Sequence, residues 1–174
     1  PLSSLVGLAL VYNRIMLRST VLRVSNTFSK SEEEEHKLPM TCTSSGRTLR
    51  VKGHSLHDAV PMDHWCVTRA DLRELRSAVQ AAVRDQRIIP SELDDFDPND
   101  TTCGPSVHTI CTQLIKPVSS FAGNTSWALM RHPCGLKCDL FVTHSWLEGI
   151  YEFIDKVLNS WPHDAHHAYC CMLS

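Results

Sequence analysis

The sequence predicts an α/β fold in which a helical region is followed by the start of a parallel sheet. Near the C-terminus, two compact apolar runs at 138–143 and 168–173 have the character of buried strands. An amphipathic helix lies between them, which is typical of a βαβ crossover with parallel strands. Upstream, residues 68–86 have the periodicity of a one-sided helix. Hydrophobic residues make up 43% and charged residues 21% of the 174 residues, close to globular averages.

The helix expected over 68–86 has both a start signal and a core face. Thr68 and Asp71 stand in the S/T-x-x-D/E relation of a capping box, and Val67 with Leu72 forms the hydrophobic staple around it. The apolar positions recur at helical spacing, at Leu72, Leu75, Val79, Ala82 and Val83. We interpret this stripe as core rather than as a groove for a partner.

Two shorter helices are expected further along the chain. Pro105 suits the first position of one helix, and Pro117 is expected to end it. The other covers 126–131. Before them, the acidic loop Glu92–Asp100 has carboxylates at alternate positions, as in a calcium loop. It lacks the glycine and the glutamate that a calcium loop needs at its sixth and twelfth positions, which favours a connecting loop.

Four segments follow from these patterns. Residues 1–24 are apolar with interspersed arginines, and a short helix and a pair of strands both fit them. Residues 25–62 are polar and charged, and we interpret them as a linker or disordered segment. A helical region covers 63–131, and the βαβ unit covers 138–174. Because a sheet of two strands leaves both edges open, we expect the chain to be part of a longer protein with further strands beyond its end.

Composition narrows the classes of partner. The net charge of −2 provides no basic face for a nucleic acid. The apolar run Leu5–Tyr12 is too short to span a bilayer and lacks the flanks of a secretory signal, so no membrane partner is expected. The eight cysteines are scattered and do not form a disulfide framework. Free thiols in a reducing compartment follow, and hence a cytoplasmic location.

The C-terminal unit contains a second start signal. Ser145 and Glu148 form an S-x-x-E capping box directly after the first strand. The apolar face of the expected helix consists of Ile150, Phe153, Ile154, Val157, Leu158 and Trp161. Pro162 limits this helix at its end.

The run Cys138-Asp-Leu-Phe-Val-Thr-His-Ser-Trp146 carries a resemblance. It resembles the first strand and following loop of TIR-like (Toll/interleukin-1 receptor-like) domains of the algal and protist type. The resemblance covers the N-terminal part of such a domain, about residues 138–174. It implies a flavodoxin-like sheet in a family whose members assemble with one another, and some of which cleave the nicotinamide bond of NAD. In the active members, the catalytic glutamate lies on a later helix. Glu148 does not match that position, so no catalytic residue is assigned.

The corner after the first strand is the predicted ligand-binding site, because ligands of open parallel sheets bind at the carboxyl ends of the strands. Its residues are Thr143, His144, Ser145 and Trp146. Free amides at the start of the next helix would favour a phosphate or carboxylate there, and the nearest basic residues in sequence are Arg131 and Lys137. The alternative is that these residues have only structural roles. Ser145 and Glu148 would then cap each other, Trp146 would pack, and His144 would form a local hydrogen bond.

A zinc site is the second chemical possibility. Cys134 and Cys138 have a feasible spacing, and His166 and His167 are candidate further ligands. A turn with surface histidines explains the same residues, so we expect no metal and no other cofactor. The vicinal Cys170 and Cys171 have the pattern of small core residues, and no cysteine nucleophile is expected.

These observations lead to one main hypothesis and two alternatives. The main hypothesis is a protein-interaction or signalling and sensing module, inactive as an enzyme, that binds a protein partner or a second copy of itself and has a possible nucleotide ligand. The first alternative is a fragment of an NAD-processing enzyme. The second is a zinc-stabilised structural protein.

Overall fold

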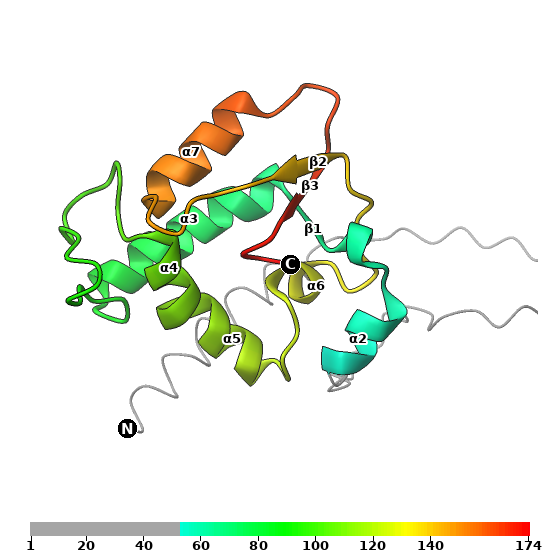
Figure 1. Ribbon diagram of the computed structural model, residues 1–174, viewed down its shortest axis with the longest axis horizontal. Coiled ribbons are helices and arrows are strands. Elements are labelled where there is room, and N and C mark those ends of the chain that lie inside the picture. The colour runs from blue at the N-terminus through cyan, green and yellow to red at the C-terminus, as the bar shows by residue number, and fades with distance from the viewer. Residues whose placement is uncertain (1–52) are drawn as a thin grey trace, which may run out of the picture.

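A computed structural model describes residues 53–174, with side chains from residue 55 (Figure 1). The segment 1–24 and most of the predicted linker lie outside the described residues. The end of that linker is ordered, since α2 (Gly53–Ala59) is a helix and a 3-10 turn follows at Met62–His64, so the linker prediction is wrong there. The remaining elements are β1 (Cys66–Thr68), α3 (Arg69–Arg84), α4 (Val107–Ile110), η3 (Cys111–Ile115), α5 (Lys116–Phe121), α6 (Trp127–Arg131), β2 (Leu140–Val142), α7 (Ile150–Ser160) and β3 (His167–Cys170).

The described residues form a three-stranded mixed sheet in the order β1-β3-β2. β2 and β3 pair in parallel with α7 between them in the chain, which confirms the predicted βαβ unit, although both strands are shorter than predicted. β1 pairs antiparallel with the other side of β3. The sequence did not predict β1, and the expectation of a sheet with only two strands in this chain is therefore wrong.

The predicted helix over 68–86 is confirmed as α3. The Thr68 hydroxyl accepts a hydrogen bond from the Asp71 amide at 3.2 Å, and the Asp71 carboxylate accepts one from the Thr68 amide at 2.7 Å, so the capping box is complete. The predicted apolar stripe is the buried face of α3, as expected: Leu72, Leu75, Val79, Ala82 and Val83. α3 contacts α7 and β1, and these elements share one hydrophobic core (Figure 1).

Asp71 also joins α3 to α6 through a buried polar network. Its side chain is 4% exposed, and it accepts hydrogen bonds from Arg131 Nε at 3.0 Å and His132 Nε2 at 2.7 Å. Arg131 Nη2 donates a further bond to Glu74 at 2.6 Å. Burial by itself would raise the pKa of Asp71, but the hydrogen bonds from His132 and Thr68 outweigh it and hold the pKa well below its usual value.

The predicted end of a helix at Pro117 is wrong. α4, η3 and α5 are continuous, and η3 is a π-helical turn in which the Lys116 amide donates to the Cys111 carbonyl, five residues back. A proline inside an α-helix lacks an amide and clashes with the carbonyl four residues before it. The wider π turn changes this register just before Pro117, which then occupies the first turn of α5.

The acidic loop between α3 and α4 connects the two helices, as expected. Asp94 accepts hydrogen bonds from the Ser106 amide at 2.8 Å and from the Thr109 hydroxyl, at the start of α4. Asp100 accepts from the amides of Thr102 and Gly104 at 2.7 and 3.1 Å. These carboxylates therefore fold the loop. No helix among the described residues is long and apolar enough to cross a membrane.

Candidate functional site

The carboxyl ends of the two parallel strands meet, because Val142 of β2 is the register partner of Cys170 of β3. The residues that follow each strand are therefore neighbours. His144 follows β2 and Cys171 follows β3, and the Cys171 Sγ lies 3.4 Å from His144 Nδ1. This pair, 27 residues apart in sequence, lies at the corner that the strand order identified as a site.

His144 is held in place by aromatic rings. Its ring centroid lies 4.8 Å from that of Trp146 and 5.8 Å from that of Phe153 on α7, both in edge-to-face geometry. Burial lowers the pKa of His144, and the charge of Glu148 opposes this effect in part. The imidazole is thus neutral at neutral pH, and one of its ring nitrogens can accept a proton or a hydrogen bond.

Trp146 packs less than expected, since it is 52% exposed. Its ring meets that of His108 edge-on, with the centroids 6.4 Å apart. Its carbonyl accepts a hydrogen bond from the His108 amide at 3.0 Å, and the Glu148 carbonyl accepts one from the Val107 amide at 2.9 Å. The loop after β2 therefore caps the start of α4 through its backbone.

The second predicted capping box does not form. α7 begins at Ile150, its N-cap is Gly149, and no side chain caps it. Glu148 instead pairs with Lys156 at 3.1 Å. The Ser145 box fails because the chain makes a further turn over 145–149 before the helix begins.

The first two amides of α7 are already bonded to carbonyls, which leaves fewer donors for the anion expected there. The Ile150 amide donates to the Pro105 carbonyl at 2.8 Å, and the Tyr151 amide donates to the Cys103 carbonyl at 3.1 Å. A Cβ at Gly149 would collide with the Cys103 carbonyl, so only glycine allows this close approach. Of the two basic residues predicted to be nearest, Arg131 pairs with Asp71 and Glu74, and Lys137 is exposed.

A shallow depression of about 410 Å³ opens beside the His144–Cys171 pair. It is lined by His108, Cys111, Ile115, Lys116, Trp146, Cys171 and Met172. Of the four predicted site residues, Trp146 lines it and His144 contacts its Cys171 wall, whereas Thr143 and Ser145 are exposed and do not contribute. The depression combines an aromatic and aliphatic surface with one ammonium group, from Lys116.

Comparisons with family models, with curated proteins and with solved structures give no match to this chain. The site is therefore interpreted from its own geometry.

Two of the zinc candidates make other side-chain contacts. Cys138 donates its thiol hydrogen to the Leu140 carbonyl at 3.3 Å, and Nδ1 of His167 lies 3.1 Å from the Lys137 carbonyl oxygen. Cys134 is exposed. Within residues 53–174, the structure contains no group of three or more His, Cys, Asp or Glu side chains that could hold a metal ion.

Cys171 is the site residue that sequence reasoning missed. The apolar run 168–173 suggested that both vicinal thiols were core residues. Cys170 is indeed buried, and burial raises its pKa to about 12. β3 ends at Cys170, however, so Cys171 lies in the following turn and is exposed. The order of the parallel strands was the signal that could have found it, because residues after two adjacent parallel strands lie at the same end of the sheet.

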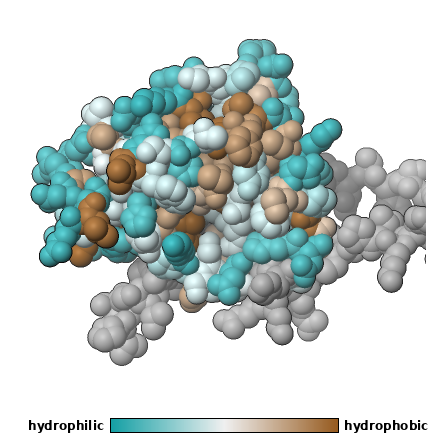
Figure 2. Space-filling view, in the orientation of Figure 1, coloured by the Kyte–Doolittle hydropathy of each residue, from teal (hydrophilic) through white to brown (hydrophobic). Residues whose placement is uncertain are grey.

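An apolar surface lies along the β2 side of the sheet. Phe141 is 65% exposed and stacks on Tyr169 of β3, with ring centroids 5.3 Å apart and planes 7° from parallel. Leu147, in the loop after β2, is 83% exposed. Figure 2 shows brown side chains gathered over the part of the molecule where β2 and β3 lie in Figure 1. We call Phe141, Trp146 and Leu147 the β2 strip.

Proposed function

We propose that this chain is a protein-interaction module of the signalling or sensing type that associates with a second copy of itself through β2 and the β2 strip. The observation that supports this most strongly is the edge position of β2. Among the described residues β2 pairs only with β3, and its central side chain, Phe141, is largely exposed.

The composition of β2 supports pairing at this edge. A free strand edge presents unpaired amides and carbonyls, and proteins usually block such edges with charged residues, prolines or bulges. Leu140, Phe141 and Val142 include none of these. Two copies related by a two-fold axis could join their β2 edges in antiparallel fashion, since a two-fold interface uses the same patch on both subunits.

The resemblance of 138–174 to TIR-like domains supports the same proposal, because members of that family assemble with one another. The NAD-processing alternative has less support. A nucleotide phosphate would have used the amides at the start of α7, and the amides of Ile150 and Tyr151 donate to carbonyls of the 103–105 loop instead.

Sedimentation velocity across a wide range of protein concentrations tests the proposal. The wild-type chain is expected to shift from monomer to dimer as concentration rises. Phe141→Asp and Leu147→Asp should each weaken this association at least about tenfold, because a charge would be buried in the interface without a partner.

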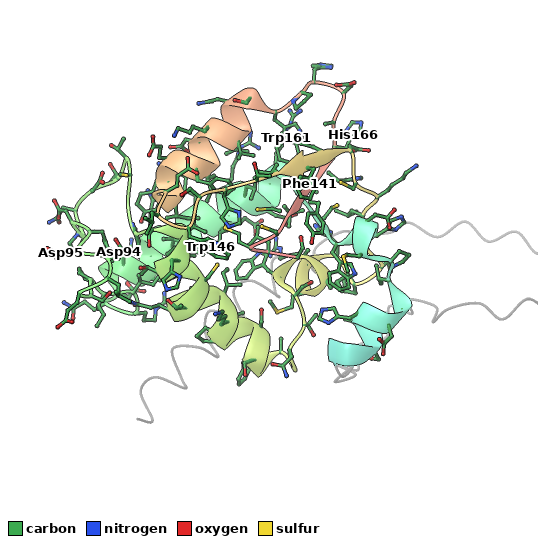
Figure 3. All side chains as sticks on the ribbon, in the orientation of Figure 1. Asp94, Asp95, Phe141, Trp146, Trp161 and His166 are labelled. Carbon is green, nitrogen blue, oxygen red and sulfur yellow. The ribbon has the colours of Figure 1, made fainter. Side chains whose placement is uncertain are left out.

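Leu93→Asp is the matched control for Leu147→Asp, since both leucines are 83% exposed. Leu93 belongs to the acidic loop, which lies at the far end of the molecule from Phe141, as the labelled Asp94 and Asp95 show in Figure 3. This variant should associate like the wild type. A wild-type chain that stays monomeric at every concentration, or a Leu93→Asp effect as large as that of Leu147→Asp, would contradict the proposal.

A further inference from the structure

The His144–Cys171 pair supports a chemical role that is independent of self-association. We propose that Cys171 is a reactive thiol that exchanges with small disulfides carrying carboxylates, with His144 as its general base. The depression beside the pair would hold the disulfide.

The geometry of the pair is that of a thiol and its base. Cys171 Sγ lies 3.4 Å from Nδ1 of His144 and 3.9 Å from Nε2, within the range of a hydrogen bond that involves sulfur. In the tautomer with its proton on Nε2, His144 has Nδ1, the nearer ring nitrogen, available to take up the thiol hydrogen. Edge-to-face contacts with Trp146 and Phe153 hold the ring beside the sulfur. A nucleophile within reach of a base that other side chains orient is the arrangement that activates a thiol.

Four other cysteines provide a contrast within the same chain. Burial is the largest effect on three of them, and it raises the pKa of Cys66 and Cys170 to about 12 and that of Cys111 to about 11. Cys103 is exposed like Cys171, but its Sγ lies 3.8 Å from a Glu152 carboxylate. Its pKa is raised by desolvation and by that negative charge. Because the thiolate is the attacking species, these environments suppress reactivity.

The exchange step balances without any further reagent. As Sγ of Cys171 attacks one sulfur of the disulfide RS–SR, its proton passes to Nδ1 of His144. A new S–S bond forms to Cys171, the old S–S bond breaks, and the leaving thiolate takes the proton back from the imidazolium as RSH. The Cys171 sulfur is oxidised and the leaving sulfur is reduced, as in any thiol–disulfide exchange.

The depression explains why a disulfide with carboxylates is the expected class. Cys171 lies in its wall, and Lys116 in the same wall provides an ammonium group for a carboxylate. Its volume of about 410 Å³ is within the range of small-molecule sites. Trp146 and Met172 provide an apolar surface for the carbon chain of the ligand.

The test uses the full chain, glutathione disulfide as the probe and mass spectrometry over time. The peptides are fragmented so that each modification is assigned to a single cysteine, because Cys170 and Cys171 are adjacent. Cys171 should form the mixed disulfide at least about tenfold faster than Cys103. The neutral 2-hydroxyethyl disulfide should react more slowly at Cys171 than glutathione disulfide does. Lys116→Glu should lower the rate with glutathione disulfide relative to the rate with 2-hydroxyethyl disulfide at Cys171.

His144→Gln tests the base. This variant should slow the modification of Cys171 about tenfold or more and leave the rate at Cys103 unchanged. The buried Cys170 serves as an internal control for folding, since its modification would show that the variant had unfolded. Equal rates at Cys171 and Cys103 in the wild type, or an unchanged rate at Cys171 in folded His144→Gln, would overturn the proposal.

Discussion

His132 and His144 have different kinds of partner: a buried carboxylate and an exposed thiol. Comparing them separates the groups that stabilise the fold from those available for chemistry. His132 donates to Asp71, which is 4% exposed and accepts from Thr68 and Arg131 as well. His144 is partnered by the thiol of Cys171, with exposed residues on both sides of it in the chain. The Asp71 carboxylate and the Arg131 guanidinium are buried at the centre of their network. The corner at His144 opens onto a depression and an exposed apolar strip.

The largest effect is expected from removing the buried carboxylate at the centre of the Asp71 network. Asp71→Asn leaves the Arg131 side chain, which is 8% exposed, without its buried carboxylate partner. Removal of one partner from a buried ion pair costs about 3–5 kcal/mol of unfolding free energy. Urea denaturation of the wild type and the variant would measure the loss.

Glu74→Gln is the control for this variant, because Glu74 pairs with the same arginine but is 39% exposed. It should cost no more than about 1 kcal/mol, as exposed ion pairs do. Equal losses of unfolding free energy in the two variants would show that the buried Asp71 contributes no more to stability than the exposed Glu74.

The second expected effect is a pH dependence of stability that is caused by the Asp71 carboxylate. The pKa of Asp71 is lower in the folded chain than its ordinary value of 3.8. Its contribution to stability is therefore complete above that value and decreases as the pH falls below it toward the folded pKa. Between pH 6 and pH 3, Asp71→Asn should lose less stability than the wild type, as measured by urea denaturation. Parallel curves would assign the acid sensitivity to other carboxylates.

The smallest expected effect compares the two capping boxes that the sequence suggested. Thr68→Ala should cost about 1 kcal/mol, because it removes the hydroxyl that accepts from the Asp71 amide. Ser145→Ala should change stability by less than about 0.5 kcal/mol, because Ser145 is exposed and caps no helix. Thermal or urea denaturation of both variants checks the difference. A larger loss for Ser145→Ala would mean that its hydroxyl has a structural role.

Those two boxes also show what the sequence could and could not reveal about the fold. Thr68 and Asp71 predicted the start of α3 because the cap, the staple and the apolar stripe are all local. Ser145 and Glu148 have the same spacing, but the start of α7 is fixed by carbonyls of Cys103 and Pro105, more than 40 residues away. β1 was missed for a related reason. It has only three residues, and its pairing with β3 depends on a segment about 100 residues further along the chain.

The sequence led to the prediction of a site at the corner after β2, but it did not predict the depression there or the contact with Cys171. The strand order placed Thr143–Trp146 at the carboxyl end of the sheet, and two of these residues, His144 and Trp146, do lie at the depression or its wall. The depression itself depends on α4, η3 and α5, whose path past Pro117 the sequence did not predict. The exposure of Cys171 depends on a strand that ends one residue before it, a boundary that local patterns do not define.

The central claim is that the exposed side of β2 is an interface between copies of this chain. Hydrogen exchange of the peptide that contains 140–142, measured by mass spectrometry at low and high protein concentration, tests it most directly. We expect amide exchange in this peptide to slow as concentration rises, because the free edge becomes hydrogen-bonded, and we expect Phe141→Asp to abolish this change. Exchange in β2 that is the same at every concentration, in a wild-type chain that nevertheless associates, would contradict the claim and place the interface elsewhere.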